Sequence, residues 1–139
     1  MQLTTKGRYA VTAMLDLASN ETGKPTTLDI ISQRQNISLS YLEQLFSKLR
    51  RANLVKSVRG PGGGYFLDAK AKDINLAQII EAVDENIDLR RCKGFRGCNK
   101  GRQCVSHQLW CEVSQQIRTF LHDKTLQMVI DNYEIKGIK

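Results

Sequence analysis

The chain has little proline, little aromatic content and no long apolar run. Two of its 139 residues are proline and 6% are Phe, Trp or Tyr, a composition that favours a helical fold over a β-sandwich. No segment approaches the roughly 18 consecutive apolar residues of a membrane span. The N-terminal residues also lack the apolar core of a signal peptide. We therefore predict a globular protein with a cytoplasmic location and no membrane partner.

The charge is unbalanced in favour of basic residues. Lysine and arginine number 21 against 14 acidic residues, which gives a formal net charge of +7. Such an excess fits a polyanionic partner, most simply nucleic acid. The segment 48–59 contains no acidic residue. Its basic residues are Lys48, Arg50, Arg51, Lys56 and Arg59. Taken alone, this segment is equally consistent with a solvated basic surface.

The apolar spacing in the first quarter of the chain predicts two helices. The first begins near Thr4 or Thr5 and ends before the turn signal Gly23-Lys24-Pro25. The second covers residues 27–34 and is followed by Asn36, which suits a left-handed backbone. Its expected buried residues are Leu28, Ile30 and Ile31.

A third helix is predicted to start at Ser38 or Ser40 and to end at about Arg51. Its expected buried stripe is Leu39, Leu42, Leu45, Phe46 and Leu49. A helix, a three-residue turn and a second helix that is polar at its N-terminal end form the helix-turn-helix pattern of DNA-binding proteins.

A β-hairpin and further helices complete the expected fold. Residues 54–58 and 65–67 are predicted strands, and the glycine-rich turn 60–64 joins them into the wing of a winged helix-turn-helix. Another helix ends near Asp84, and a long helix covers about residues 104–123. The fold class is therefore mainly α with a small β-hairpin wing, followed by a long C-terminal dimerisation helix.

The dimerisation helix is inferred from its apolar face, which looks too long for a chain of this size to cover by itself. The face consists of Val105, Leu109, Trp110, Val113, Ile117, Phe120 and Leu121. We expect it to pack against the same helix of a second copy in a two-fold homodimer. Three units result: a winged helix-turn-helix DNA-binding domain at 1–85, a ligand loop at 86–103, and the dimerisation helix with a short C-terminal helix at 104–139.

The start of the third helix supplies the candidate DNA-reading residues, because that end of a recognition helix faces the base edges of the major groove. They are Ser38, Ser40, Tyr41, Glu43 and Gln44. The Gln44 amide suits adenine, and the Glu43 carboxylate suits the amino group of cytosine. Ser40-x-x-Glu43 also matches a capping box, in which the carboxylate would serve only to hold the helix start.

Arg59 begins the turn of the wing, where a guanidinium can enter a narrow minor groove. A phosphate contact or plain solvation is the alternative. The glycine run beside it is not a nucleotide-binding P-loop, since it lacks the Gly-Lys-Ser/Thr ending and opens no helix.

The second candidate site is the run Cys92-x5-Cys98-x5-Cys104-x2-His107. Thiolate and imidazole are ligands of zinc and of iron–sulfur clusters. Structural zinc usually takes its cysteines as C-x2-4-C pairs, so two successive five-residue gaps favour a larger, two-iron cluster. Zinc, or free thiols without a metal, are the alternatives.

The fourth ligand position has two candidates. His107 and Cys111 share a helical face with Cys104, at about 5 Å and about 10.5 Å along the helix axis. The shorter separation favours His107, and a histidine ligand is expected to raise the reduction potential of the cluster.

Four segments carry a resemblance to a known family: residues 3–10, 37–46 and 58–65, and the run from Cys92 to His107. In these segments the sequence resembles the iron–sulfur cluster regulators of the Rrf family, which are bacterial winged helix-turn-helix transcription factors. The resemblance extends over nearly the whole chain, and the triple-glycine wing together with the cysteine spacing makes it specific.

The resemblance implies a homodimeric bacterial transcription factor, not an enzyme, that binds double-stranded DNA operators. It implies one 2Fe–2S cluster per subunit, held by Cys92, Cys98, Cys104 and His107. It also implies control of cluster-assembly genes, with repression by the cluster-bound form and action of the apo form at a second class of sites. Glu43 resembles the residue that penalises one class of sites when the cluster is absent. A nitric oxide or redox sensor and an electron-transfer protein are the alternative functions.

Overall fold

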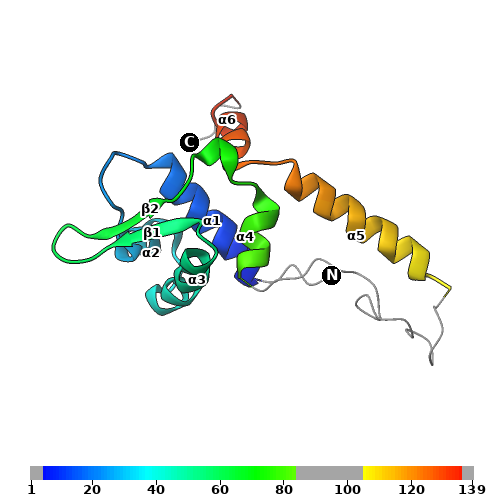
Figure 1. Ribbon diagram of the computed structural model, residues 1–139, viewed down its shortest axis with the longest axis horizontal. Helices are drawn as coiled ribbons and strands as arrows, with labels where there is room; N and C mark the ends of the chain where they lie inside the picture. Colours follow the sequence, from blue (N-terminus) through cyan, green and yellow to red (C-terminus); the bar gives the residue numbers. More distant parts are fainter. Residues whose placement is uncertain (1–4, 84–104, 136–139) are drawn as a thin grey trace.

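The computed structural model of the chain describes residues 5–83 and 105–135. Three helices come first, α1 (Thr5–Ser19), α2 (Leu28–Gln35) and α3 (Leu39–Arg51). The hairpin strands β1 (Val55–Val58) and β2 (Gly64–Leu67) follow. The short 3-10 helix η1 (Ala71–Asp73) and the helices α4 (Leu76–Ala82), α5 (His107–His122) and α6 (Leu126–Ile135) complete the order. Figure 1 shows the hairpin extending from one side of the molecule and α5 from the other.

Side-chain caps fix the junction between α2 and α3. Asn36 ends α2 in the left-handed conformation, with φ 55° and ψ 47°, as its sequence position predicts. Ser38 caps α3, and its hydroxyl accepts a hydrogen bond from the Tyr41 backbone N–H at 3.2 Å. Because α2 ends at Gln35 and α3 begins at Leu39, three residues turn the chain. The predicted helix-turn-helix is therefore present.

The structure contradicts the proposed capping box of α3. Since Ser38 is the cap, Ser40 and Glu43 both lie inside the helix, and Glu43 is exposed. The Glu43 carboxylate is therefore available for another role.

Two predicted core residues are also wrong. Ile30 is 44% exposed because it lies at least about 100° around α2 from the buried pair Leu28 and Ile31. Leu39 is 39% exposed, since it is the first residue of α3 and lies at the edge of the buried stripe. The buried residues of α3 are Leu42, Leu45, Phe46 and Leu49.

The hairpin has the predicted antiparallel register, with Val55 opposite Leu67 and Val58 opposite Gly64. Its turn is closed by a hydrogen bond from the Gly63 N–H to the Gly60 carbonyl at 2.9 Å. Gly62 has a φ of 76°, which is the backbone that the third position of a type II turn after proline requires. The turn conformation is thus encoded locally.

The last helix, α6, packs against α1 and η1. The Leu126 N–H donates to the Ile74 carbonyl at 3.0 Å, and the Leu76 N–H donates to the Lys124 carbonyl at 2.9 Å. Leu126 is fully buried in the same core as the helix-turn-helix. The division into units at 1–85, 86–103 and 104–139 stays a prediction, and residues 86–103 lie outside the described ranges.

Helix α5 packs against α4 and otherwise extends away from the winged domain (Figure 1). On its predicted dimerisation face, Leu109 is 52% and Phe120 is 60% exposed. Two members of that face differ from the prediction: Val105 precedes the helix, which begins at His107, and Leu121 packs against the core of the same chain. Among residues 5–83 and 105–135, no helix is long and apolar enough to cross a membrane.

Candidate nucleic-acid interface

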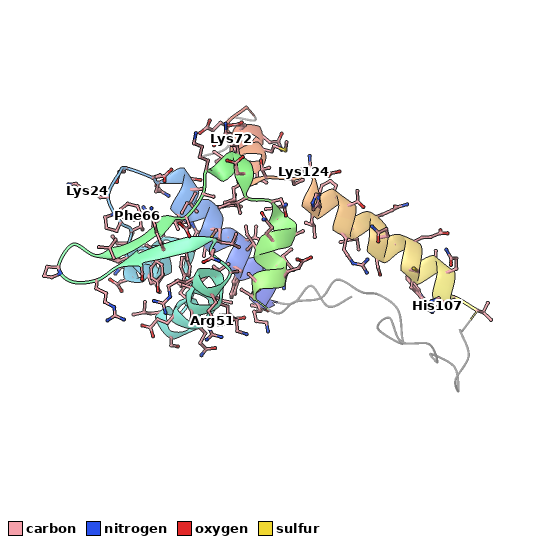
Figure 2. The ribbon with its side chains drawn as sticks, in the orientation of Figure 1. Lys24, Arg51, Phe66, Lys72, His107 and Lys124 are labelled. Atoms are coloured by element: carbon pink, nitrogen blue, oxygen red, sulfur yellow. The ribbon has the colours of Figure 1, made fainter. Side chains whose placement is uncertain are left out.

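The face of α3 opposite the core is polar and exposed. Ser40, Gln44 and Arg51 lie within about 40° of one another around the helix, and all three are exposed. Figure 2 shows Arg51 on α3 at the lower edge of the molecule. Two of the predicted DNA-reading residues therefore share one surface with a basic residue.

A second group of α3 residues faces the wing. Leu39, Glu43 and Arg50 lie within about 40° of one another. The Arg50 guanidinium donates to the Ser57 hydroxyl of β1 at 3.4 Å, so this flank of α3 is the one beside the hairpin. Glu43 consequently lies between the polar face and the wing.

Tyr41 occupies the opposite flank of α3 and is supported by α1. Its ring meets the Tyr9 ring edge-on, with centroids 5.8 Å apart and an interplanar angle of 69°. Tyr41 is half-buried, whereas Ser38 at the cap is exposed. The structure thus places the five DNA-reading candidates at the cap and in the N-terminal half of α3, and Tyr41 packs against Tyr9 of α1.

The wing is held to the rest of the domain at its base. Tyr65 of β2 pairs with Thr26 through two backbone hydrogen bonds of 2.8 and 3.0 Å, and its ring meets Phe46 edge-on at 5.0 Å. Gly64 permits the close approach, because a Cβ there would lie 2.5 Å from the Thr26 carbonyl oxygen. Arg59, the predicted wing residue, is exposed directly after β1.

The basic segment 48–59 covers the end of α3 and strand β1. Arg50, Arg51, Lys56 and Arg59 are exposed, and Lys48 is half-buried. No acidic residue stands between them in the sequence, so the end of α3 and strand β1 carry a basic border. Such a border suits a phosphate backbone.

A buried carboxylate orients α2 just before the turn. The Asp16 side chain is 1% exposed and pairs with the Arg34 guanidinium at 2.8 Å. The Gln35 amide donates to its other oxygen at 2.7 Å. These bonds join α1 to the last two residues of α2, next to the turn that positions α3.

Of the predicted cluster ligands, the structure describes only His107, while Cys92, Cys98 and Cys104 lie outside the described residues. His107 is the first residue of α5 and is half-buried. Figure 2 shows it at the end of α5 remote from Lys124. Cys111 lies one turn further on and is also half-buried. Within the described part of the chain, no three His, Cys, Asp or Glu residues gather as a metal site. Three thiols and one imidazole remain a donor set suited to an iron–sulfur cluster.

Sequence reasoning did not find the roles of three residues around α3. Tyr9 supports Tyr41, Arg50 connects α3 to β1, and Leu39 is exposed at the helix start. The first two are contacts between elements and have no local signal. The exposure of Leu39 follows from its position at the helix end, once Ser38 is known to be the cap.

A capped reader helix, a three-residue turn and a hairpin wing define a winged helix-turn-helix protein of the DNA-binding class. Residues 3–132 match the Rrf2 family, described as iron-dependent transcriptional regulator, and the chain belongs to this family. The family resemblance and the predicted mainly α fold with a hairpin wing are both confirmed, while dimerisation through α5 stays a prediction.

The relatives carry the names of transcriptional regulators. The HTH-type transcriptional regulator IscR of Klebsiella pneumoniae is 54% identical over 99% of this chain and 85% of its own length. A putative HTH-type transcriptional regulator of Azotobacter vinelandii is also 54% identical, over 99% and 84%. The solved structure of T. potens IscR is 35% identical, with a TM-score of 0.80 over 100% of this chain and 93% of that one. These names agree with a regulatory, non-enzymatic protein.

Proposed function

We propose that this chain is a DNA-binding regulator that senses iron–sulfur cluster status and controls the genes for cluster assembly. The observation that supports it most directly is the run Cys92…Cys98…Cys104…His107 in a chain with a winged helix-turn-helix fold. The high identity to proteins named IscR supports the same proposal. We infer a cytoplasmic location from this function.

The proposed cofactor is a 2Fe–2S cluster held by the thiolates of Cys92, Cys98 and Cys104 and by the His107 imidazole. When bound, such a cluster supplies a group that is sensitive to iron supply and to redox state. Three thiolates and one neutral imidazole place one negative charge fewer on the cluster than four thiolates would.

The proposed DNA contacts are made by both elements of the winged domain. The N-terminal end of α3 enters the major groove, where Ser38, Ser40, Tyr41, Glu43 and Gln44 meet bases or backbone. Arg59 of the wing enters the adjacent minor groove. Two copies joined through α5 read two half-sites of one operator.

We propose that ligation at Cys92, Cys98, Cys104 and His107 fixes the 90–103 segment in one conformation and thereby changes how α3 and the wing meet DNA. The Glu43 carboxylate then discriminates between two classes of operator. Both states bind DNA, but they prefer different sites.

The first test is anaerobic purification with a visible spectrum and with iron and sulfide analysis. A coloured protein with about two irons and two sulfides per chain is expected for this cluster. A colourless protein with one zinc would contradict the proposal. A cluster protein that binds no DNA would favour an electron-transfer function. If exposure to nitric oxide abolishes both the cluster spectrum and DNA binding, a nitric oxide sensor is favoured instead.

The second test assigns the ligands. Cys92→Ala should abolish the cluster absorbance and yet leave binding to one class of operators. His107→Cys should shift the spectrum, whereas Cys111→Ala, one turn further along α5, should leave it unchanged. If only the Cys111 variant shifts the spectrum, the proposed ligand set is wrong. If Cys92→Ala binds every operator with the affinity of the parent, cluster ligation does not change DNA binding.

A further inference from the structure

Leu39 is an exposed apolar side chain at the start of α3. It is 39% exposed and is not one of the buried residues that form the hydrophobic core. Its neighbours along the chain, Ser38 and Ser40, are exposed as well. More than a third of this apolar side chain therefore faces solvent beside two exposed serines, where a polar residue would be the ordinary choice.

Leu39 lies at the N-terminal end of α3. It is the first residue of the helix, directly after the cap. Because Cα–Cβ bonds in a helix tilt toward the N-terminus, its side chain extends past the start of the helix. In a helix-turn-helix this is the end that faces the base edges of the major groove.

Leu39 also lies on the same flank of α3 as Glu43. Residues four apart on a helix have Cβ atoms about 5–6 Å apart, and both side chains are exposed. The hydrogen bond from Arg50 to Ser57 identifies this flank as the one beside the wing. An apolar group therefore accompanies the carboxylate that would accept from a cytosine amino group.

In the major groove, one base feature is apolar: the 5-methyl group of thymine. We infer that Leu39 is a specificity-determining residue that contacts a thymine 5-methyl group next to the base read by Glu43. This inference rests on the proposed entry of α3 into the major groove. Burying one methyl group against leucine favours thymine over an unmethylated pyrimidine by about fourfold in affinity.

The experiment uses duplex DNA selected from random sequences by the full-length protein. Each thymine of the selected site is replaced in turn by deoxyuridine, which keeps every hydrogen-bonding group and removes only the methyl. The parent protein should bind about fourfold more weakly at one position per half-site. Leu39→Ala should bind the unmodified duplex with a similar loss and should be insensitive to deoxyuridine at that position.

Two further variants control for structure. Leu39→Met keeps an apolar contact and should retain the deoxyuridine penalty. Ile30→Ala removes another exposed aliphatic side chain, 44% exposed on α2, and should keep both the affinity and the penalty of the parent. Melting midpoints of all variants should stay near that of the parent, because the side chains they change lie outside the core.

The inference is overturned if Leu39→Ala binds the unmodified duplex as well as the parent does, or if deoxyuridine costs both proteins the same. Either result leaves DNA binding itself intact. If the parent protein selects no DNA at all, the proposed function fails instead, so the two failures are distinguishable.

Discussion

The Ser38 hydroxyl accepts the Tyr41 backbone N–H at 3.2 Å, and this single bond fixes where the reader helix begins. It satisfies one of the N–H groups that every helix start leaves without an intrahelical partner. It also places Leu39 and Ser40 in the first turn of α3, the part of a recognition helix that meets the bases.

Removing this cap should reduce stability, whereas charging it should reduce DNA affinity. Ser38→Ala should lower the free energy of unfolding by about 1 kcal/mol. Ser38→Asp keeps a capping oxygen and should preserve stability, but its negative charge faces the phosphates and should weaken binding. Chemical denaturation and operator titration measure the two effects.

Asn75 provides the matched control, because its side chain caps α4 by accepting the Gln78 N–H at 2.9 Å. Asn75→Ala should cost a similar free energy without the charge effect on DNA. Undiminished operator binding by Ser38→Asp would show that the start of α3 does not face the DNA.

Because the wing lies close to Thr26, we expect Gly64 to be sensitive to substitution. A Cβ at Gly64 would lie 2.5 Å from the Thr26 carbonyl oxygen, so Gly64→Ala must displace the backbone pairing that holds β2. We expect a loss of about 1–3 kcal/mol in stability and weaker operator binding, because Arg59 is then misplaced. Calorimetry and operator titration test this.

Gly23→Ala is the control for backbone strain at a positive φ. Gly23 has a φ of 81°, and a Cβ added there would have no neighbouring atom within 4 Å, so alanine costs about 1–2 kcal/mol through its backbone conformation alone. Its operator affinity should match the parent. Equal DNA affinity of the Gly64 and Gly23 variants would indicate that the wing does not contribute to binding.

The Asp16–Arg34 pair should be coupled energetically. Asp16→Ala leaves the Arg34 and Gln35 donors without their acceptor and should cost about 1–3 kcal/mol. In a double-mutant cycle with Arg34→Ala, the coupling should be about 0.5–3 kcal/mol. The exposed pair of Gln33 and Asp29, bonded at 3.1 Å, is the control and should couple by a few tenths of a kcal/mol, about what helix-surface pairs show. A coupling no larger than in this control would mean that Asp16 does not hold the end of α2.

The helix-turn-helix was predictable because its signals are local. Asn36 and Ser38 adopt the turn and cap conformations that their chemistry favours, and the hairpin turn follows from Pro61 and Gly62. Two serines two residues apart are both good caps, however, and their spacing cannot choose between them. The choice of Ser38 accompanies the burial of Ile37, which is 4% exposed, and that burial is a tertiary contact.

The remaining differences also arise from contacts between distant segments. The packing of α6 on the winged domain uses the backbone hydrogen bond from Leu126 to Ile74. The spacing of apolar residues in the sequence does not predict this contact. Ile30 and Leu39 were assigned to the core by spacing alone, although burial depends on which neighbour covers each face. The cluster ligands are the reverse case. Their spacing is read from the sequence, and ligation by Cys92, Cys98, Cys104 and His107 stays a prediction.

The exposed face of α5 yields the final prediction. Phe120 is 60% and Trp110 is 38% exposed, and we expect a second copy to cover both. Phe120→Ser should raise the dimer dissociation constant at least about tenfold, because burying a phenylalanine side chain is worth about 1.5–3 kcal/mol. Sedimentation equilibrium measures this, and Met128→Ser, which changes a 50% exposed residue on α6, is the control.

Trp110 is the only tryptophan of the chain, so its fluorescence should shift to shorter wavelength as the parent dimerises. A monomeric parent, or an emission spectrum that does not change with concentration across the monomer–dimer transition, would assign this face to another partner.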